Sequence, residues 1–547
     1  MKTMTQIQKK NTKKRRKPNY TKRAKRLQKE LMLSIALIFL TLLICVKFQS
    51  SPNIYRVVVF EQNNEIKEIQ YYNNFKTAKK QMQKQIENGA YNPAVLNEDG
   101  KILAIRYGIV NFRTKTCTEN TSYEIERNGH SGYTNGCYGG DGAFLETDND
   151  AKKVKFKQSG VIGWADIADI EIQNAFAPET ASINHYTVKD NAILHHGTTN
   201  PKEAEYALMI NIGDNDASLK AETTYYSYDA HYFYTTFQSM IDDYRNQTYE
   251  NSINKDAPHY NYYQYLTHRA KTSYVSKDLN WYISTYLGYS SKPSSFPPNP
   301  CESQLYDEGY TFIETQNKYG INAIMMLSLA INESGFGRSQ ISIEKNNLFG
   351  HAAYDNAPNE SANGYKDVAS SIQTHAQIFL NNGYLNPCDQ ADSFSPSTCY
   401  NSENNRYKGG YFGDKDSGMN VFYASDPYWG EKAAKYYQDI DALLGEKDKT
   451  RYTIKVLNNQ AKTPVYGMPD TSGKVIFYTP DVESYALVIL DELEGGEVNG
   501  NTKWYKVQSD GMLNPSANAL NQEPQIYAYK TDVVYIPAAY FENNDVK

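Results

Sequence analysis

Residues 321–339 read INAIMMLSLAINESGFGRS, and this stretch decides how the central part of the chain folds. Residues 321–330 carry no charge and are apolar at nearly every position, so a helix here has to be buried on all sides. Glu333 is the first charged residue after that run, and Gly335 suits the C-terminal cap of a helix. The sequence therefore predicts a buried helix over 321–334 that ends in a lone carboxylate.

A carboxylate at that position has unusual chemistry. Partial burial and the negative end of the helix dipole both favour the neutral acid, and a neutral acid can protonate a leaving-group oxygen. Gly335 and Gly337 would let a bulky polymer approach the backbone, and Phe336 would shield the acid from water. The alternative is ordinary: a solvated Glu at a helix end, followed by a glycine stop signal.

The segments around this helix predict a mostly helical unit over residues 301–446. Helical patterns cover residues 302–320, 367–383 and 425–445, the last with Asp426 as its cap and Pro427 in its first turn. Residues 447–547 read instead as short alternating segments separated by turn residues, which predicts a small β-barrel.

Two further regions precede the helical unit. Residues 49–215 alternate between strand, helix and hairpin patterns, which predicts an α+β or mostly β module without a catalytic signature. Residues 216–300 are rich in tyrosine, are predicted to be helical and close with a Pro-rich connection. The chain has 48 tyrosines, whose flat faces and polar tips suit sugars and wet interfaces, although cores and strands use tyrosine too.

The N-terminus predicts a membrane anchor. Thirteen Lys and Arg residues in 1–30 form a basic tail directly before the uncharged run 31–46. Residues 31–48 are therefore expected to be a transmembrane signal anchor, with the tail in the cytoplasm and the rest of the chain outside the cell. A cleaved signal peptide is the alternative. The adjacent apolar run argues against nucleic acid as the partner of the basic tail.

The six cysteines fit an exported protein. Cys45 lies in the predicted membrane run. Cys117 and Cys137 flank one polar loop and Cys388 and Cys399 flank another, so two local disulfides are predicted and Cys301 is left over. No CxxC pair or HExxH motif occurs, and the nine histidines are scattered. We therefore expect neither a metal site nor a cofactor.

The motifs AINESGFGRSQISIEKNNLFGHAAYD and NVFYASDPYWGEKAAKYY resemble the peptidoglycan endo-β-N-acetylglucosaminidases of glycoside hydrolase family 73. The resemblance covers about residues 301–445. It implies a lysozyme-like, mostly α (α+β) catalytic domain with a small β-lobe and Glu333 as the general acid. It also implies that Tyr423 acts in the groove. Residues implied to contact the sugar are Asn346, Asn347, Phe349 and Tyr365.

The second catalytic group stays open in the sequence. The resemblance implies that a base lies in the β-lobe, where Asp355 is the first candidate and Glu360 the second. A base would lie about 6.5–9.5 Å from the acid in an inverting enzyme, and a nucleophile about 5–5.5 Å away in a retaining one. A third possibility is that the acetamido group of the substrate is the nucleophile.

The sequence thus predicts a multidomain, membrane-anchored protein with an extracellular catalytic domain and a C-terminal SH3-like barrel. The barrel resembles wall-binding modules, or serves only for packing. The expected activity is hydrolysis of the β-1,4 bond between N-acetylglucosamine and N-acetylmuramic acid, with peptidoglycan glycan strands as the partner and no protein partner indicated. The alternatives are a lytic transglycosylase and an inactive wall-binding scaffold.

Overall fold

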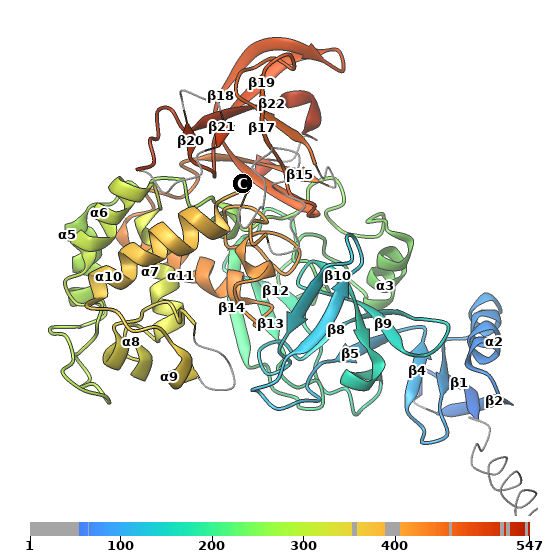
Figure 1. The fold of residues 1–547 in the computed structure, drawn as a ribbon. Helices are drawn as coiled ribbons and strands as arrows, with labels where there is room; N and C mark the ends of the chain where they lie inside the picture. Colours follow the sequence, from blue (N-terminus) through green and yellow to red (C-terminus); the bar gives the residue numbers. More distant parts are fainter. Residues whose placement is uncertain are drawn as a thin grey trace, which may run out of the picture.

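The computed structural model describes residues 54–63, 65–352, 358–388, 405–458, 462–514, 519–520, 526–541 and 545–546. These residues form a sheet-rich region, a helical region and a C-terminal sheet (Figure 1).

The membrane-spanning part of the predicted fold class is corrected. Within the described ranges, no helix is both long enough and apolar enough to cross a bilayer. The longest, α11, has 16 residues and is about 24 Å long, against about 30 Å of hydrocarbon. The predicted tail and signal anchor, residues 1–48, lie outside the described residues. The fold is that of a multidomain chain with sheet-rich and helical regions.

The first region is an eleven-stranded antiparallel sheet in the order β2-β1-β3-β4-β11-β5-β8-β9-β10-β6-β7. Its strands are β1 (Tyr55–Phe60), β2 (Ile66–Tyr72), β3 (Asn92–Leu96), β4 (Ile102–Ile105), β5 (Gly108–Asn111), β6 (Thr121–Ile125), β7 (Ser131–Thr134), β8 (Asp141–Thr147), β9 (Lys153–Gln158), β10 (Val161–Asp166) and β11 (Glu171–Asn174). Helix α2 (Phe75–Glu87) packs on β1 and β3, and Asn74 caps it by accepting from the Thr77 amide at 3.1 Å. We call this eleven-stranded region the upstream sheet. A short turn, η1 (Ile167–Asp169), precedes β11.

The tyrosine-rich segment follows a three-stranded sheet of β12 (His185–Lys189), β13 (Ala192–Gly197) and β14 (Leu208–Asp214). It is less helical than predicted: its helices are α3 (Phe237–Asn246), α4 (Tyr262–Tyr265), α5 (Ser276–Trp281) and η2 (Tyr282–Tyr286). The reason is that its tyrosine hydroxyls form hydrogen bonds with residues of other elements. The hydroxyl of Tyr228 donates to Asp141 at 2.6 Å, and that of Tyr263 donates to Asp441 at 2.7 Å. The segment thus joins the sheet to the helices.

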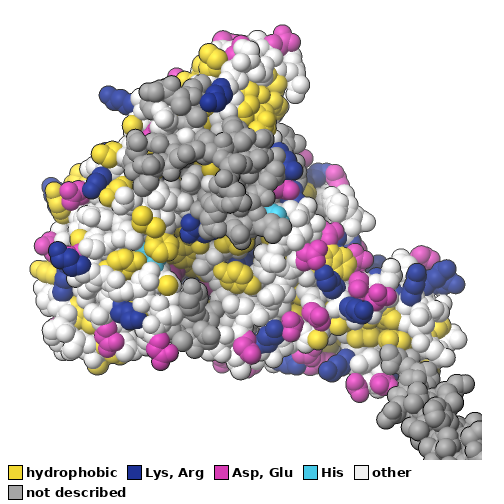
Figure 2. Space-filling view, viewed as in Figure 1, with side chains coloured by type: hydrophobic (Ala, Val, Ile, Leu, Met, Phe, Trp, Pro, Cys, Tyr) yellow, Lys and Arg dark blue, Asp and Glu magenta, His cyan; other side chains and the backbone are white. Residues whose placement is uncertain are grey.

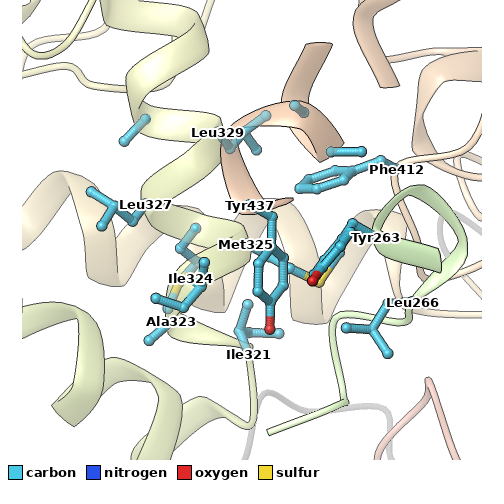
Figure 3. Close-up of a cluster of buried hydrophobic side chains, with 14 of the residues drawn as sticks. Tyr263, Leu266, Ile321, Ala323, Ile324, Met325, Leu327, Leu329, Phe412 and Tyr437 are labelled. Atoms are coloured by element: carbon cyan, nitrogen blue, oxygen red, sulfur yellow. The ribbon is translucent and has the colours of Figure 1, made fainter. Parts of the chain in front are cut away.

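The helical region is built around α7 (Ala323–Ser334). Its other elements are α6 (Gly309–Tyr319), α8 (Gln340–Lys345), α9 (Pro358–Ser361), α10 (Val368–Thr374), η3 (His375–Tyr384), η5 (Met419–Val421) and α11 (Trp429–Leu444). Figure 3 shows the side chains of α7 packed against those of α4 and α11. The predicted buried helix is confirmed: Asn322 caps its start, and Gly335 ends it with φ 55°. Two predicted starts are wrong, because α6 begins at Gly309 and α11 at Trp429.

The C-terminal region is a seven-stranded sheet in the order β17-β16-β22-β19-β18-β15-β23. Its strands are β15 (Thr453–Asn458), β16 (Pro464–Tyr466), β17 (Val475–Tyr478), β18 (Ser484–Val498), β19 (Asn501–Gln508), β22 (Val533–Pro537) and β23 (Asp545–Val546); β20 (Leu513–Asn514), β21 (Ala519–Leu520) and η6 (Ala538–Tyr540) lie beside it. Ile454 and Val488 from this sheet belong to the same buried cluster as α7. The sheet and the helices therefore share one core.

The cysteines are placed as follows. Cys117 and Cys137 form the predicted disulfide, with Cα atoms 5.5 Å apart. Cys388 is disulfide-bonded, and Cys399, its predicted partner, lies outside the described residues. Cys301 is a free, exposed thiol.

Candidate functional site

Glu333 reaches the surface because α7 stops directly after it. The chain turns at Gly335 and Phe336, both with positive φ, and the amide of Phe336 donates back to the Ile331 carbonyl at 3.0 Å. However, neither Gly337 nor Phe336 has the role that the sequence predicted. A Cβ on Gly337 would lie 2.8 Å from Ser303 Oγ, so this glycine permits internal packing. The Phe336 ring packs on Tyr436 instead of shielding the acid.

The Glu333 carboxyl is held by an indole from another helix. Trp429 Nε1, in the first turn of α11, donates to Glu333 Oε1 at 2.5 Å, and Asn332 Nδ2 donates to the same oxygen at 3.3 Å. On the other side, a Cβ on Gly350 would lie 3.4 Å from Glu333 Oε2. One carboxyl oxygen is therefore fixed by donors, while the other faces a position without a side chain.

Burial raises the pKa of Glu333 to about 7. The negative charge of Asp426 raises this pKa further, while the hydrogen bonds from Trp429 and Asn332 lower it. Because desolvation disfavours the anion, it is the largest of these effects. At neutral pH, a substantial fraction of the molecules therefore still carries a protonated Glu333 carboxyl.

Glu333 lines a groove of about 780 Å³ between the helices and the upstream sheet. Figure 2 shows hydrophobic side chains around a hollow in the middle of this face. The groove is lined by Asn120, Tyr133, Tyr138, Asn332, Glu333, Phe349, Gly350, His351, Ala352, Phe379, Tyr384, Phe422, Tyr423, Ala424, Ser425, Asp426, Trp429 and Lys432. Eight of these are aromatic side chains of Phe, Tyr or Trp, and they surround Glu333 and the Asp426–Lys432 ion pair.

Tyr423 lies beside the acid. Its ring stacks on that of Trp429, with centroids 4.5 Å apart and planes at 27°. Its hydroxyl donates to the Phe349 carbonyl at 3.2 Å. Burial, and then the neighbouring Glu333 charge, raise the pKa of Tyr423 well above its ordinary value, so the phenol stays neutral.

Of the other residues predicted to contact sugar, only Phe349 lines the groove. Asn346 ends α8 with φ 53° and donates to the Tyr365 carbonyl at 3.0 Å. Asn347 is buried and donates to the His351 carbonyl at 3.0 Å. Both amides thus hold the turn that presents Phe349 and Gly350.

His351 also lines the groove, although no sequence pattern singled it out. Its Nδ1 lies 2.7 Å from the Tyr365 hydroxyl, and its ring stacks on Phe379 with centroids 3.7 Å apart. Burial lowers the pKa of His351 to about 3, so the imidazole is neutral. Tyr365 is therefore placed behind the groove wall as a support for His351.

The second carboxylate predicted for catalysis is not identified among the described lining residues. Asp355 lies outside the described residues, and Glu360 is exposed on α9 away from the groove lining. Among the described lining residues, the only other carboxylate is Asp426. It forms an ion pair with Lys432 at 2.5 Å and accepts from the Tyr428 amide at 2.9 Å, so it fixes the turn before α11. Within the described ranges, no three His, Cys, Asp or Glu side chains group as metal ligands.

The part of the chain that carries Glu333 is similar to known proteins. Residues 309–442 match the glucosaminidase family, described as mannosyl-glycoprotein endo-beta-N-acetylglucosaminidase. Two Streptococcus pneumoniae proteins, from serotype 4 and strain R6, each named "Putative endo-beta-N-acetylglucosaminidase", are 40% identical to the chain over 146 residues. That alignment covers 27% of this chain, and the chain spans about a fifth of the length of these relatives.

Solved structures of Staphylococcus aureus autolysin E also align with the chain. The structure with the disaccharide NAG-NAM has 20% identity and a TM-score of 0.22 over 33% of this chain and 73% of that one. A structure of the same autolysin without a named ligand has 21% identity and a TM-score of 0.23 over 33% and 72%.

Proposed function

We propose that this chain, whose residues 309–442 form a glucosaminidase domain, is a peptidoglycan hydrolase with Glu333 as its general acid. The observation that carries this proposal is a carboxyl with a pKa of about 7 on the wall of an aromatic groove. The bond to be cleaved is the β-1,4 bond between N-acetylglucosamine and N-acetylmuramic acid. The disulfide supports action outside the cytoplasm, where peptidoglycan is found.

The contacts of the carboxyl favour one oxygen as the proton carrier. Oε1 accepts hydrogen bonds from Trp429 and Asn332, so the proton resides on Oε2. Oε2 faces Gly350, where the missing side chain leaves room for a sugar. In this mechanism Oε2 protonates the bridging oxygen as the glycosidic bond breaks, and a water molecule then attacks the anomeric carbon.

We propose Asp355 as the base that activates this water, with Glu360 as the second candidate and the acetamido group of the substrate as a third route. Tyr423 is proposed to support the developing charge or to orient the acetamido group. Its neutral phenol lies against Trp429, which contacts the acid. Phe349 is proposed to contact the sugar, with Asn346, Asn347 and Tyr365 holding its turn in place.

Product analysis tests this function. The full chain is incubated with purified glycan strands, and the new ends are read by mass spectrometry. Hydrolysis after N-acetylglucosamine gives reducing N-acetylglucosamine ends. Anhydro-muramyl ends would instead identify a lytic transglycosylase, and an absence of cleavage despite retention on the glycan would identify a wall-binding scaffold.

The pH dependence of kcat/KM should show an alkaline limb near pH 7. The acid has to be protonated to act, and its pKa is raised to about 7, so the rate is full below this pH. Above it, the rate falls about tenfold per pH unit. In Trp429→Phe the hydrogen bond that lowers the pKa of Glu333 is lost, so the limb should move to higher pH. If the alkaline limb stays at the same pH in Trp429→Phe, it reports the titration of a group other than Glu333.

Gly350→Ala should lower the cleavage rate by more than the loss of folded protein explains. The new methyl group would occupy the space 3.4 Å from Glu333 Oε2, and the φ of 64° adds backbone strain of about 1–2 kcal/mol. The control is Gly288→Ala, where φ is 75° and nothing lies within 4 Å of the added Cβ. Equal loss of activity in the two variants, after correction for unfolded protein, would argue against substrate at Gly350.

A further inference from the structure

One wall of the groove comes from the upstream sheet, outside the glucosaminidase match at 309–442. Asn120, Tyr133 and Tyr138 line this wall. Tyr133 belongs to β7, and Tyr138 lies at the tip of the turn 135–140 that connects β7 with β8. We call this segment the 135–140 turn. The Tyr138 side chain is 41% exposed, and the ammonium of Lys432 on α11 lies 5.8 Å from its ring centroid.

The 135–140 turn is held in shape by Asn135, which is 1% exposed. Its side chain donates to the Cys117 carbonyl and to Asn120 Oδ1, each at 3.0 Å. Its side-chain oxygen accepts from the Cys137 amide at 3.0 Å, and its carbonyl accepts from the Tyr138 amide at 3.0 Å. The Cys117–Cys137 disulfide links the same two segments. Tyr138 therefore projects from a rigid base.

The turn is also fixed to the loop that leads into Trp429, the residue that bonds the acid. The Asn135 amide donates to the Ser425 carbonyl at 2.9 Å, and the Tyr133 hydroxyl donates to the Phe422 carbonyl at 2.9 Å. At Gly139, an added Cβ would lie 2.3 Å from Pro427 Cγ, so the Gly139 backbone packs directly on the proline ring. Loop 422–428 carries Tyr423 and leads into Trp429, which bonds Glu333. The wall from the upstream sheet thus has a defined position relative to the acid.

We propose that Tyr138, presented by the 135–140 turn, is a sugar-binding subsite of the groove, in which its ring stacks on a pyranose of the glycan strand. This inference rests on the function proposed above. The chemistry of the wall favours a sugar over a charged peptide stem, because the exposed group is an aromatic face and the ammonium beside it, that of Lys432, is paired with Asp426. The substrate groove of this chain is therefore completed by a region outside its glucosaminidase domain.

Steady-state kinetics of the full chain on long glycan strands tests this subsite. Tyr138→Ala should raise KM about 2- to 12-fold, the equivalent of one aromatic contact, and leave kcat unchanged, because the subsite binds substrate and transition state alike. Tyr138→Phe keeps the ring and should restore the wild-type KM. The matched control is Tyr71→Ala on β2, where the side chain is 56% exposed and lies outside the groove lining. An unchanged KM in Tyr138→Ala, or an equal rise in all three variants, would overturn the proposal.

A binding assay separates this inference from the proposed function. Co-sedimentation with insoluble peptidoglycan is measured for Glu333→Gln alone and together with Tyr138→Ala. Weaker sedimentation of the double variant supports the subsite even if the wild-type chain cleaves nothing, an outcome that would reject only the hydrolase function. Equal sedimentation rejects the subsite even if the wild-type chain cleaves glycan.

Discussion

Replacing Glu333 by Gln in the full chain should lower the rate of glycan cleavage about 10²- to 10⁴-fold, the usual contribution of a general acid. The amide has nearly the shape of the acid, and its oxygen can still accept the hydrogen bond from Trp429 Nε1. What the amide lacks is an acidic proton for the bridging oxygen. The measurement is the release of soluble fragments from purified peptidoglycan at a pH below the pKa of Glu333.

The control for this substitution is Glu344→Gln, the same chemical change at an exposed carboxylate on α8 that does not line the groove. It should retain the wild-type rate. A Glu333→Gln variant that folds and cleaves within a few-fold of the wild-type rate would remove Glu333 from the mechanism.

The second large effect concerns stability. Leu329→Ala should reduce the free energy of unfolding by about 2–5 kcal/mol, because Leu329 is 0% exposed in the middle of α7 and its deletion leaves a cavity in the largest buried cluster. Figure 3 shows Leu329 on α7 near Phe412 and Tyr437. The change is measured as a shift of the urea unfolding midpoint, followed by circular dichroism.

Leu443→Ala is the matched comparison, because the same atoms are removed from α11 where Leu443 is 38% exposed. Its cost should stay within about 0.5 kcal/mol. If the two variants unfold at the same urea concentration, α7 is not the centre of the core that we describe.

The sequence predicted features whose signals are local. The run 321–330 specified a buried helix, and Asn322 and Gly335 mark its ends by their own backbone chemistry. The Cys117–Cys137 disulfide likewise followed from two cysteines that flank one loop. The half-buried state of Glu333 was also predictable, since it follows from the position of this residue at the end of an all-apolar helix.

The sequence could not predict contacts between distant segments. Trp429 bonds Glu333 from 96 residues away, and the Tyr133 hydroxyl bonds the Phe422 carbonyl from 289 residues away. No local pattern distinguishes such a tryptophan from one in a core. For the same reason Asn346 and Asn347 were assigned to the sugar, whereas their amides bond carbonyls of the chain itself.

The tyrosine-rich segment shows a different limit. It was predicted to be helical, but Tyr228, Tyr263 and Tyr265 place their hydroxyls on aspartates of other elements. Long-range bonds of this kind override helix propensity, which is weak for tyrosine. The segment consequently folds as a connection between the upstream sheet and the helices.

The central claim is that the Glu333 side chain is still substantially protonated at neutral pH in the groove. Difference infrared spectroscopy of the full chain, with Glu333→Gln subtracted, isolates the carbonyl band of this one protonated carboxyl. We predict that the band titrates with a midpoint near the pKa of about 7. A band already lost by about pH 5, as for an ordinary glutamate, would contradict the account.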